Sequence, residues 1–347
     1  MSDLTEKVKA RARELGFDLV GVTGAEPSAF QEEYQDWVAQ GYAGEMAYLT
    51  RNLNRRLDPR ELLPGARTII VVGMNYYTDA EEGPGLPKEG DPGLAIFARY
   101  ARGDDYHEVM SARLKELLAF LKEEAGAETE GRVYVDAGPI LEREVARRAG
   151  LGWFGKNTML INTRRGSYFF LGEIVTNVDL EQDAPAIGGC GTCTRCLDAC
   201  PTGAIVAPYQ VDARRCLSYL TIELKGSIPE EFRPAIGESG NRVFGCDICQ
   251  EVCPFNLRRS VPTAEPAFQA RAITSNSRLV DLLLLSEEEF REKFKNSPVK
   301  RAKRHGLLRN VATALASLKA PEAEPDCQTT YRSPDAGGTP PTDCTFQ

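Results

Sequence analysis

The chain has no cysteine before position 190, and its 347 residues include only two histidines, His107 and His305. With so few imidazoles, a His/carboxylate metal site or a Ser-His-Asp triad has little to draw on. Apolar runs are short, as at residues 282–285, whereas a membrane span needs roughly 20 apolar residues. Basic residues (42) are fewer than acidic ones (50), for a net charge of −8. This excludes a generally basic nucleic-acid binder but not a local basic patch.

Residues 1–19 show no continuous apolar segment and no twin-arginine pair. We therefore expect a soluble protein that stays in the cytoplasm, with no membrane association. At roughly 150 residues per domain, the length predicts two or three domains. The composition is that of an ordinary globular protein, with 42% hydrophobic and 27% charged residues, so it favours no special class.

Cysteines are concentrated in one part of the chain. Eight of the ten lie between Cys190 and Cys253, and the other two, Cys327 and Cys344, lie near the C-terminus. A secreted protein stapled by disulfides spreads its cysteines through a small domain. Clustered cysteines in a reducing compartment instead indicate metal or redox chemistry.

The first cysteine run reads Cys190-x2-Cys193-x2-Cys196-x3-Cys200-Pro. In bacterial ferredoxins, three thiolates of such a run hold one 4Fe-4S cluster and the fourth reaches the other cluster. A zinc site would use four ligands in paired C-x2-C knuckles, which gives no reason for a terminal Cys-Pro. The spacing therefore favours iron–sulfur clusters over zinc or buried structural thiols.

A second run, Cys246-x2-Cys249-x3-Cys253-Pro, is one ligand short, and Cys216 between the runs can complete the count. The crossover pattern of two-cluster ferredoxins then predicts two 4Fe-4S clusters. One would be held by Cys190, Cys193, Cys196 and Cys253, and the other by Cys200, Cys216, Cys246 and Cys249. Such a module carries electrons, but it need not contain the site that uses them.

The rest of the chain predicts an α+β protein in four parts. Periodicity indicates helices at 4–15, 105–124 and 139–149, and strands at 18–22, 68–76, 132–136, 159–162 and 168–176. A Gly/Pro-rich stretch at 82–93 is expected to be a loop. The last 27 residues contain five Pro and five Thr but no Leu, Ile, Val or Met, so we expect disorder there. The expected parts are 1–180, the cysteine module 181–258, helices 259–319 and a tail 320–347.

One glycine motif is a poor match for phosphate binding. Residues 150–155 read G-x-G-x-x-G and are followed by Lys156. A phosphate loop needs a preceding strand and a following helix, whereas here a helix is predicted before the motif and position 157 is Asn. We expect a tight turn that lines some other pocket.

Asp136 ends a predicted strand just before Ala-Gly-Pro and a predicted helix. On the residues alone, its commoner role is a helix N-cap. The alternative is a catalytic acid that faces a cofactor, provided that burial raises its pKa. His107 is expected at a polar helix start, so a carboxyl group is the better candidate for a proton donor.

Residues 291–310 contain eight Lys or Arg and a single acid, Glu292. A solvated helix face would explain this composition. A binding surface for a polyanion would explain it equally well, because phosphate contacts depend on local charge. The residues alone leave both explanations open.

Several segments resemble the epoxyqueuosine reductase family over about residues 4–318, including all eight clustered cysteines. No general ferredoxin shares the motifs that precede the cysteines. The matching segments include Asp58-Pro-Arg-Glu-Leu-Leu-Pro, Arg99-Tyr-Ala-Arg-Gly-Asp-Asp-Tyr-His, Val135-Asp-Ala-Gly-Pro-Ile-Leu-Glu, Ala149-Gly-Leu-Gly-Trp-Phe-Gly-Lys-Asn, Val211-Asp-Ala-Arg-Arg-Cys-Leu-Ser-Tyr-Leu-Thr and Gly245-Cys-Asp-Ile-Cys-Gln.

The resemblance implies an enzyme that reduces epoxyqueuosine at the tRNA wobble position to queuosine, the last step of queuosine biosynthesis. It implies an N-terminal cobalamin domain with a mixed sheet similar to that of reductive dehalogenases, then a ferredoxin-like module and HEAT-like helices. Removing the epoxide oxygen as water takes two electrons and two protons. The clusters would feed electrons singly to cobalamin, whose cobalt(I) form is strongly reducing.

The resemblance also implies which residues act. The family's proton donor is an aspartate in the motif that contains Asp136, which favours the acid over the N-cap. The corrin, base-off and without a protein histidine on cobalt, would be lined by Arg56, Ala98, Asp136, Leu160, Asn162, Leu171 and Ser218.

A tRNA anticodon arm needs phosphate contacts. The resemblance therefore favours the polyanion explanation of the basic segment, with nucleic-acid contacts from Lys300, Arg301, Lys303, Arg304 and Arg309. We also expect a monomer and an external electron donor such as a flavodoxin or ferredoxin.

The alternatives are a cobalamin-dependent reductive dehalogenase, a plain two-cluster electron-transfer protein and a tRNA-binding module that has lost catalysis. Dehalogenases typically carry a twin-arginine signal, which residues 1–19 lack. An electron-transfer protein would hold iron without cobalt. Family members continue with apolar helical repeats where this chain becomes rich in Pro and Thr after Leu318. The C-terminal helical region is therefore expected to be incomplete.

Overall fold

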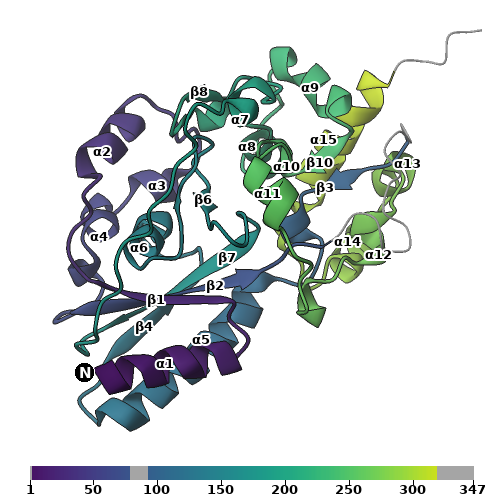
Figure 1. Cartoon of the computed structure of the whole chain (residues 1–347). Coiled ribbons are helices and arrows are strands. Elements are labelled where there is room, and N and C mark those ends of the chain that lie inside the picture. Colours follow the sequence, from purple (N-terminus) through teal and green to yellow (C-terminus); the bar gives the residue numbers. More distant parts are fainter. Residues whose placement is uncertain (1, 79–92, 319–347) are drawn as a thin grey trace, which may run out of the picture.

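The computed structural model describes residues 2–78 and 93–318. It has the predicted α+β composition, with helices on both faces of one sheet and a second, mostly helical half (Figure 1). The expected tail and most of the expected loop at 82–93 lie outside the described residues. Among the helices that are described, none combines the length and apolar character needed to cross a membrane.

A four-stranded antiparallel sheet in the order β1-β2-β7-β4 forms the centre of the N-terminal half. The strands are β1 (Leu19–Gly24), β2 (Thr68–Asn75), β7 (Phe169–Thr176) and β4 (Gly131–Tyr134). Every residue of β2 is buried, as its continuous apolar sequence predicts for a strand covered on both faces. Helices α1 (Ser2–Glu14) and α5 (Tyr106–Ala125) cover one face and α6 (Glu142–Arg148) the other (Figure 1).

One local prediction was wrong. The helix expected from Pro139 begins only at Glu142, because residues 135–140 form a series of bends after β4. The two strands expected around the turn at residues 164–166 are present as β6 (Leu160–Ile161) and β7. Strand β6 pairs with β5 (Trp153–Phe154), whereas β7 lies in the central sheet.

The connection between β1 and β2 carries the helices α2 (Gln31–Ala39), α3 (Ala47–Thr50), α4 (Leu53–Leu57) and η1 (Pro59–Glu61). The second half begins after β7. Its elements are α7 (Arg195–Asp198), β8 (Ile205–Ala207), β9 (Gln210–Val211), η3 (Ala213–Arg215), α8 (Leu217–Ile222), η4 (Glu230–Phe232), α9 (Arg233–Glu238), β10 (Arg242–Phe244), α10 (Ile248–Glu251), α11 (Pro254–Arg259), η5 (Pro266–Phe268), α12 (Ala272–Ser275), α13 (Leu279–Leu283), α14 (Glu287–Lys293), η6 (Pro298–Ala302) and α15 (Lys303–Ser317).

A segment from the first 180 residues joins this second half. Strand β3 (Ile96–Phe97), which precedes η2 (Arg99–Ala101), pairs in parallel with β10. The rings of Phe97, Phe244 and Phe294 are fully buried in one apolar core that spans β3, β10 and the C-terminal helices. Helix α15 packs on α9 and α13 against the same core (Figure 1). The cysteine module therefore shares one core with β3 and the C-terminal helices.

Candidate active site

All eight clustered cysteines are free thiols, and the first group lies around Cys196. Burial raises the pKa of Cys196 to about 11, and the neighbouring thiols of Cys190, Cys253 and Cys193 contribute. Cys253 belongs to the second run in sequence, yet it packs with Cys190 against Trp153. The fold thus brings together the four cysteines of the first predicted group.

The second group lies around Cys216, at the start of α8. Burial raises the pKa of the Cys216 thiol, with Cys200 as its neighbour. Burial likewise raises the pKa of Cys246 to about 12, beside Cys216. The thiol of Cys249 is close to both Cys216 and Cys246. These four are the second predicted group, and bound iron would offset the cost of ionising such buried thiols.

Within the described ranges, no three Cys, His, Asp or Glu side chains are arranged around a single metal ion. Each thiolate of a 4Fe-4S cluster binds a different iron, so cluster ligands lie farther apart than the ligands of one ion. The donor set of two groups of four free thiols fits two clusters.

The glycine motif contacts the cysteine module. As predicted, a helix (α6) precedes it, and the strand predicted after it is β6, while β5 lies within the motif. The backbone N–H of Lys156 lies 3.4 Å from the Cys190 sulfur, and its ammonium group donates to the Gly191 carbonyl at 2.8 Å and to the Cys193 carbonyl at 3.0 Å. The side-chain amide of Asn157 donates to the Cys249 carbonyl at 3.1 Å. The turn therefore joins both cysteine groups to the N-terminal half.

Asp136 lies in the bend that follows β4. Its Oδ2 accepts a hydrogen bond from the Tyr106 hydroxyl at 2.6 Å and lies 3.5 Å from Nε2 of His107. Its backbone N–H donates to Oε1 of Glu142 at 2.6 Å. The residue that caps α6 is Leu141, so the N-cap prediction for Asp136 was wrong. The Asp136 side chain is 61% exposed and therefore open to a ligand.

The proton of this network resides on His107. Burial raises the pKa of Asp136, but hydrogen bonds from His107 and Tyr106 outweigh burial and leave that pKa below its usual value. Burial lowers the pKa of His107, but Asp105 and Asp136 outweigh it and raise the pKa to about 9. The condition set for a catalytic acid at Asp136, a raised pKa, is therefore not met, because the carboxylate has two donors that outweigh burial.

Sequence reasoning missed the role of His107. Asp105 does cap α5, accepting from the His107 backbone N–H at 3.1 Å, as expected for a polar helix start. A second contact, 2.8 Å between Asp105 Oδ1 and His107 Nδ1, orients the ring toward Asp136. Helix α5 and β4 both pack on β7, and only that tertiary arrangement reveals the pair.

The residues predicted to line a corrin fall into two sets. Leu160 and Leu171 pack in the apolar cluster that also contains Ile140. Arg56 is buried there, donating to the carbonyls of Ile140 at 3.3 Å and Tyr48 at 3.1 Å. Among the described residues, its Nε has no partner. This buried, unsatisfied donor beside the Asp136 loop fits a polar group on a ligand.

The second set of residues predicted to line the corrin consists of Asn162, Ala98 and Ser218. Asn162 donates to the Leu151 carbonyl at 2.7 Å. Ala98 donates its N–H to the Phe244 carbonyl at 2.8 Å, and Ser218 lies in α8. Ala98 and Ser218 therefore belong to the side of the site formed by the cysteine module.

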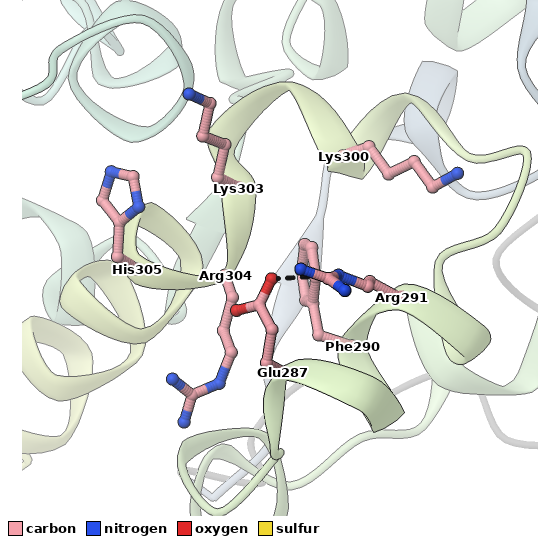
Figure 2. A pocket seen from close by; sticks show the side chains of 7 residues that line it. All are labelled: Glu287, Phe290, Arg291, Lys300, Lys303, Arg304 and His305. Atoms are coloured by element: carbon pink, nitrogen blue, oxygen red, sulfur yellow. Dashed lines mark ion pairs between the residues drawn. The ribbon is translucent and has the colours of Figure 1, made fainter.

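The basic segment runs from the end of α14 through η6 into α15, and part of it lines a pocket of about 340 Å³. Figure 2 shows Lys300 and Lys303 at this pocket, with their ammonium groups directed away from the ion pair between Glu287 and Arg291. Both lysines are exposed. Arg304 lines the same pocket but donates to the Leu285 carbonyl at 2.6 Å.

The two remaining arginines of the segment already have partners. Arg301 pairs with Glu223 at 2.9 Å, and its charge is close enough to help lower the pKa of Asp136. Arg309 donates to the backbone carbonyls of Leu220, Leu224 and Gly226. Its guanidinium therefore holds the protein together and has little capacity left for a phosphate.

Comparison with known proteins agrees with this geometry. Residues 189–256 match the 4Fe-4S double cluster binding domain, and residues 56–137 match the family described as "Epoxyqueuosine reductase QueG, DUF1730". An epoxyqueuosine reductase from Pseudomonas aeruginosa is 44% identical over 320 residues, which cover 90% of this chain and 85% of that protein.

Solved structures are similar over the same extent. An epoxyqueuosine reductase with an epoxyqueuosine-modified tRNA-Tyr stem loop has a TM-score of 0.83 at 35% identity, covering 91% of this chain and 81% of that one. The Bacillus subtilis enzyme, with an aspartate-bearing catalytic loop swung out of its active site, has a TM-score of 0.82 at 34% identity, covering 91% and 82%. The predicted double-cluster domain is confirmed, and this chain belongs to the epoxyqueuosine reductase family.

Proposed function

We propose that this protein reduces epoxyqueuosine in tRNA to queuosine, using two 4Fe-4S clusters and cobalamin, in the cytoplasm where tRNA is modified. The observation that carries the proposal is the exposed Asp136 carboxylate, bonded to Tyr106 and His107, in a chain that also holds two groups of four thiols. The Asp136 carboxylate and its partners supply a proton, and the thiol groups hold the clusters that supply electrons. Family membership supports the substrate, since one relative was solved with an epoxyqueuosine-modified stem loop.

The reaction needs two electrons and two protons, because the epoxide oxygen leaves as water and an alkene remains. We assign one proton to the pair of His107 and Asp136. His107 holds it at neutral pH, since its pKa is raised to about 9 by its two carboxylate neighbours against the effect of burial. Asp136 Oδ2, 3.5 Å away and exposed, passes the proton to the substrate oxygen. Tyr106 orients the carboxylate through its hydroxyl.

Cobalamin, when bound, would supply a strongly reducing cobalt centre that accepts electrons from the clusters. The unsatisfied Nε of Arg56, beside the apolar side chains of Leu160 and Leu171, supports binding on this side of Asp136. Ala98, Asn162 and Ser218 would complete the lining. A one-electron carrier such as a flavodoxin or ferredoxin is the matching external donor, because each cluster accepts electrons singly.

The test is the metal content of protein purified anaerobically with cobalamin supplied, followed by an assay on epoxyqueuosine-containing tRNA. About eight irons and one cobalt per chain are expected, with queuosine detected by mass spectrometry of the digested tRNA. Iron without cobalt would instead support an electron-transfer protein. A protein that binds both cofactors and dehalogenates a substrate but forms no queuosine would be a dehalogenase. A protein that binds tRNA but neither cofactor would be a non-catalytic module.

The basic segment gives a separate prediction about tRNA. Lys300 and Lys303 are exposed and line the pocket in Figure 2, so we propose that both contact backbone phosphates near the site. Replacing both with glutamine should weaken tRNA binding about tenfold near physiological salt, and reduce the slope of log K against log salt by about 1.5.

The matched control is Lys115→Gln, which removes an exposed positive charge from α5. It should leave both the affinity and the salt slope unchanged. Equal slopes for the double variant and the parent protein would show that the basic segment is a solvated surface. Arg309 is left intact in this test because its carbonyl contacts stabilise the fold.

A further inference from the structure

A buried acid lies in the central sheet close to the Asp136 loop. Glu173 of β7 pairs with Val71 of β2 and Tyr134 of β4. Its relative exposure is 0%, and among the described residues neither carboxyl oxygen has a hydrogen-bond donor. An ionised carboxylate buried without a donor is very unfavourable. Glu173 must therefore be neutral, with its proton shared with another acceptor.

Glu142, the first residue of α6, is that acceptor. The two carboxyl groups interact directly, and this contact and the Glu142 charge add to the burial that raises the pKa of Glu173 well above its usual value. Burial raises the pKa of Glu142 to about 8, and the negative charge of Asp136 contributes. Two carboxylates in contact cannot both ionise near neutral pH. The pair therefore keeps at least one proton at pH 7, and it titrates as a unit.

The same Glu142 also holds the catalytic loop. Its Oε1 accepts the backbone N–H of Asp136 at 2.6 Å. Asp136 has a φ of 56°, a left-handed conformation that residues other than glycine rarely adopt and that persists only when neighbours enforce it. Tyr106 and His107 hold the carboxylate, whereas Glu142 is the group that holds the backbone.

We propose that Glu142 and Glu173 are positioning residues, a proton-sharing carboxyl pair in which Glu173 is the neutral member and Glu142 holds the backbone of the Asp136 loop in place.

The other ionisable groups around the pair act in known directions. Arg143, the next residue on α6, favours the ionised form of Glu142. Tyr106, on α5, senses the Glu142 charge, which contributes to raising the pKa of the Tyr106 hydroxyl after burial and Asp136. Of these neighbours, Asp136 is the one that is negative at neutral pH, since its pKa is below its usual value.

The first measurement is infrared spectroscopy of the full chain with its clusters. A carbonyl stretch of a protonated carboxyl group should be present at pH 7, far above the usual pKa of a glutamate, and should shift on labelling with ¹³C-glutamate. Glu173→Gln should remove this band, while Glu123→Gln, at an exposed acid of α5, should leave it intact. A parent protein without the band at pH 7 would overturn the proposal.

The second measurement is hydrogen exchange of the Asp136 amide at pH 7. In Glu142→Ala protection should fall at least about tenfold, because the acceptor of the Asp136 backbone N–H is lost. Glu142→Gln should restore the protection, because its amide oxygen can still accept. In Glu173→Gln the amide group remains a donor to Glu142, so protection should persist. Equal protection in the parent protein and Glu142→Ala would contradict the inference.

This inference rests on the proposed role of Asp136 only for its effect on turnover, where Glu142→Ala should lower the rate of conversion and Glu142→Gln should restore it. Both measurements above need neither cobalamin nor tRNA. A protein that fails to form queuosine but shows the expected band and exchange would keep the positioning pair and lose the proposed function. A protein that forms queuosine but lacks the expected band and exchange pattern would keep the proposed function and rule out the positioning pair. A merely structural role would alter stability without changing the band of the protonated carboxyl group.

Discussion

Asp136→Asn is expected to abolish queuosine formation while the iron content stays that of the parent protein. The amide cannot take a proton from His107 and pass it on, and loss of a general acid typically costs about 10²- to 10⁴-fold in rate. The substitution preserves the loop, because Glu142 binds the backbone N–H of residue 136 and Tyr106 can still donate to the amide oxygen. Single-turnover conversion, followed by mass spectrometry of digested tRNA, measures the effect.

The matched control is Asp281→Asn, at an exposed carboxylate on α13, which should convert substrate at the parent rate. The pH profile gives a second check. Because the pKa of His107 is raised to about 9, the proton is available below that pH and activity should decline as the pH rises through it. His107→Gln should lower the rate and remove this decline. Parent-like conversion by Asp136→Asn would exclude the carboxylate from proton transfer.

Residues whose role depends on local sequence were predictable. The run at 68–72 consists of apolar and β-branched residues without interruption, and it forms most of the fully buried strand β2. The cysteine spacing predicted groups that include the distant Cys253, because the ferredoxin pattern itself specifies the exchange of ligands between runs. The fold brings Cys253 to Cys190 and Cys196, as that pattern requires.

Residues whose role depends on packing between distant segments were not predictable. His107 and Asp136 are separated by a helix and a strand, so no periodicity relates them; their contact exists because α5 and β4 share β7 as a neighbour. For Arg309, the sequence instead suggested a role in binding that its position in the fold disfavours. Its charge suggested a phosphate contact, but its position on α15 directs the guanidinium into the protein, onto three carbonyls.

The sequence around Glu173 does indicate an unusual acid. It is an acid inside the otherwise apolar and small run at 169–176, which forms a central strand. A charged residue is almost never fully buried unless it is paired, so an acid at such a position predicts a neutral carboxyl group or a specific partner. The partner itself could not be found from spacing, because Glu142 reaches Glu173 only through the packing of α6 on the sheet.

Cys216→Ser is expected to lower the iron content from about eight to about four per chain and to halve the visible absorbance of the clusters. Cys216 is outside both spaced runs, so this variant tests the ligand that spacing alone leaves least certain. Its thiol is close to Cys200 and Cys249, and a serine hydroxyl is a poor ligand for iron–sulfur clusters. Multiple turnover should stop, because electrons would no longer pass through both clusters.

Cys327→Ser is the matched control, since it makes the same substitution at a cysteine far from both runs and should leave iron unchanged. The crossover can be tested with the same assay. Cys253→Ser should leave the cluster that survives in Cys193→Ser, whereas Cys249→Ser should leave the other one, and electron paramagnetic resonance of the reduced proteins can tell the two apart. If Cys253→Ser instead matched Cys249→Ser, each run would hold its own cluster. Iron unchanged in Cys216→Ser would remove that residue from the ligand set.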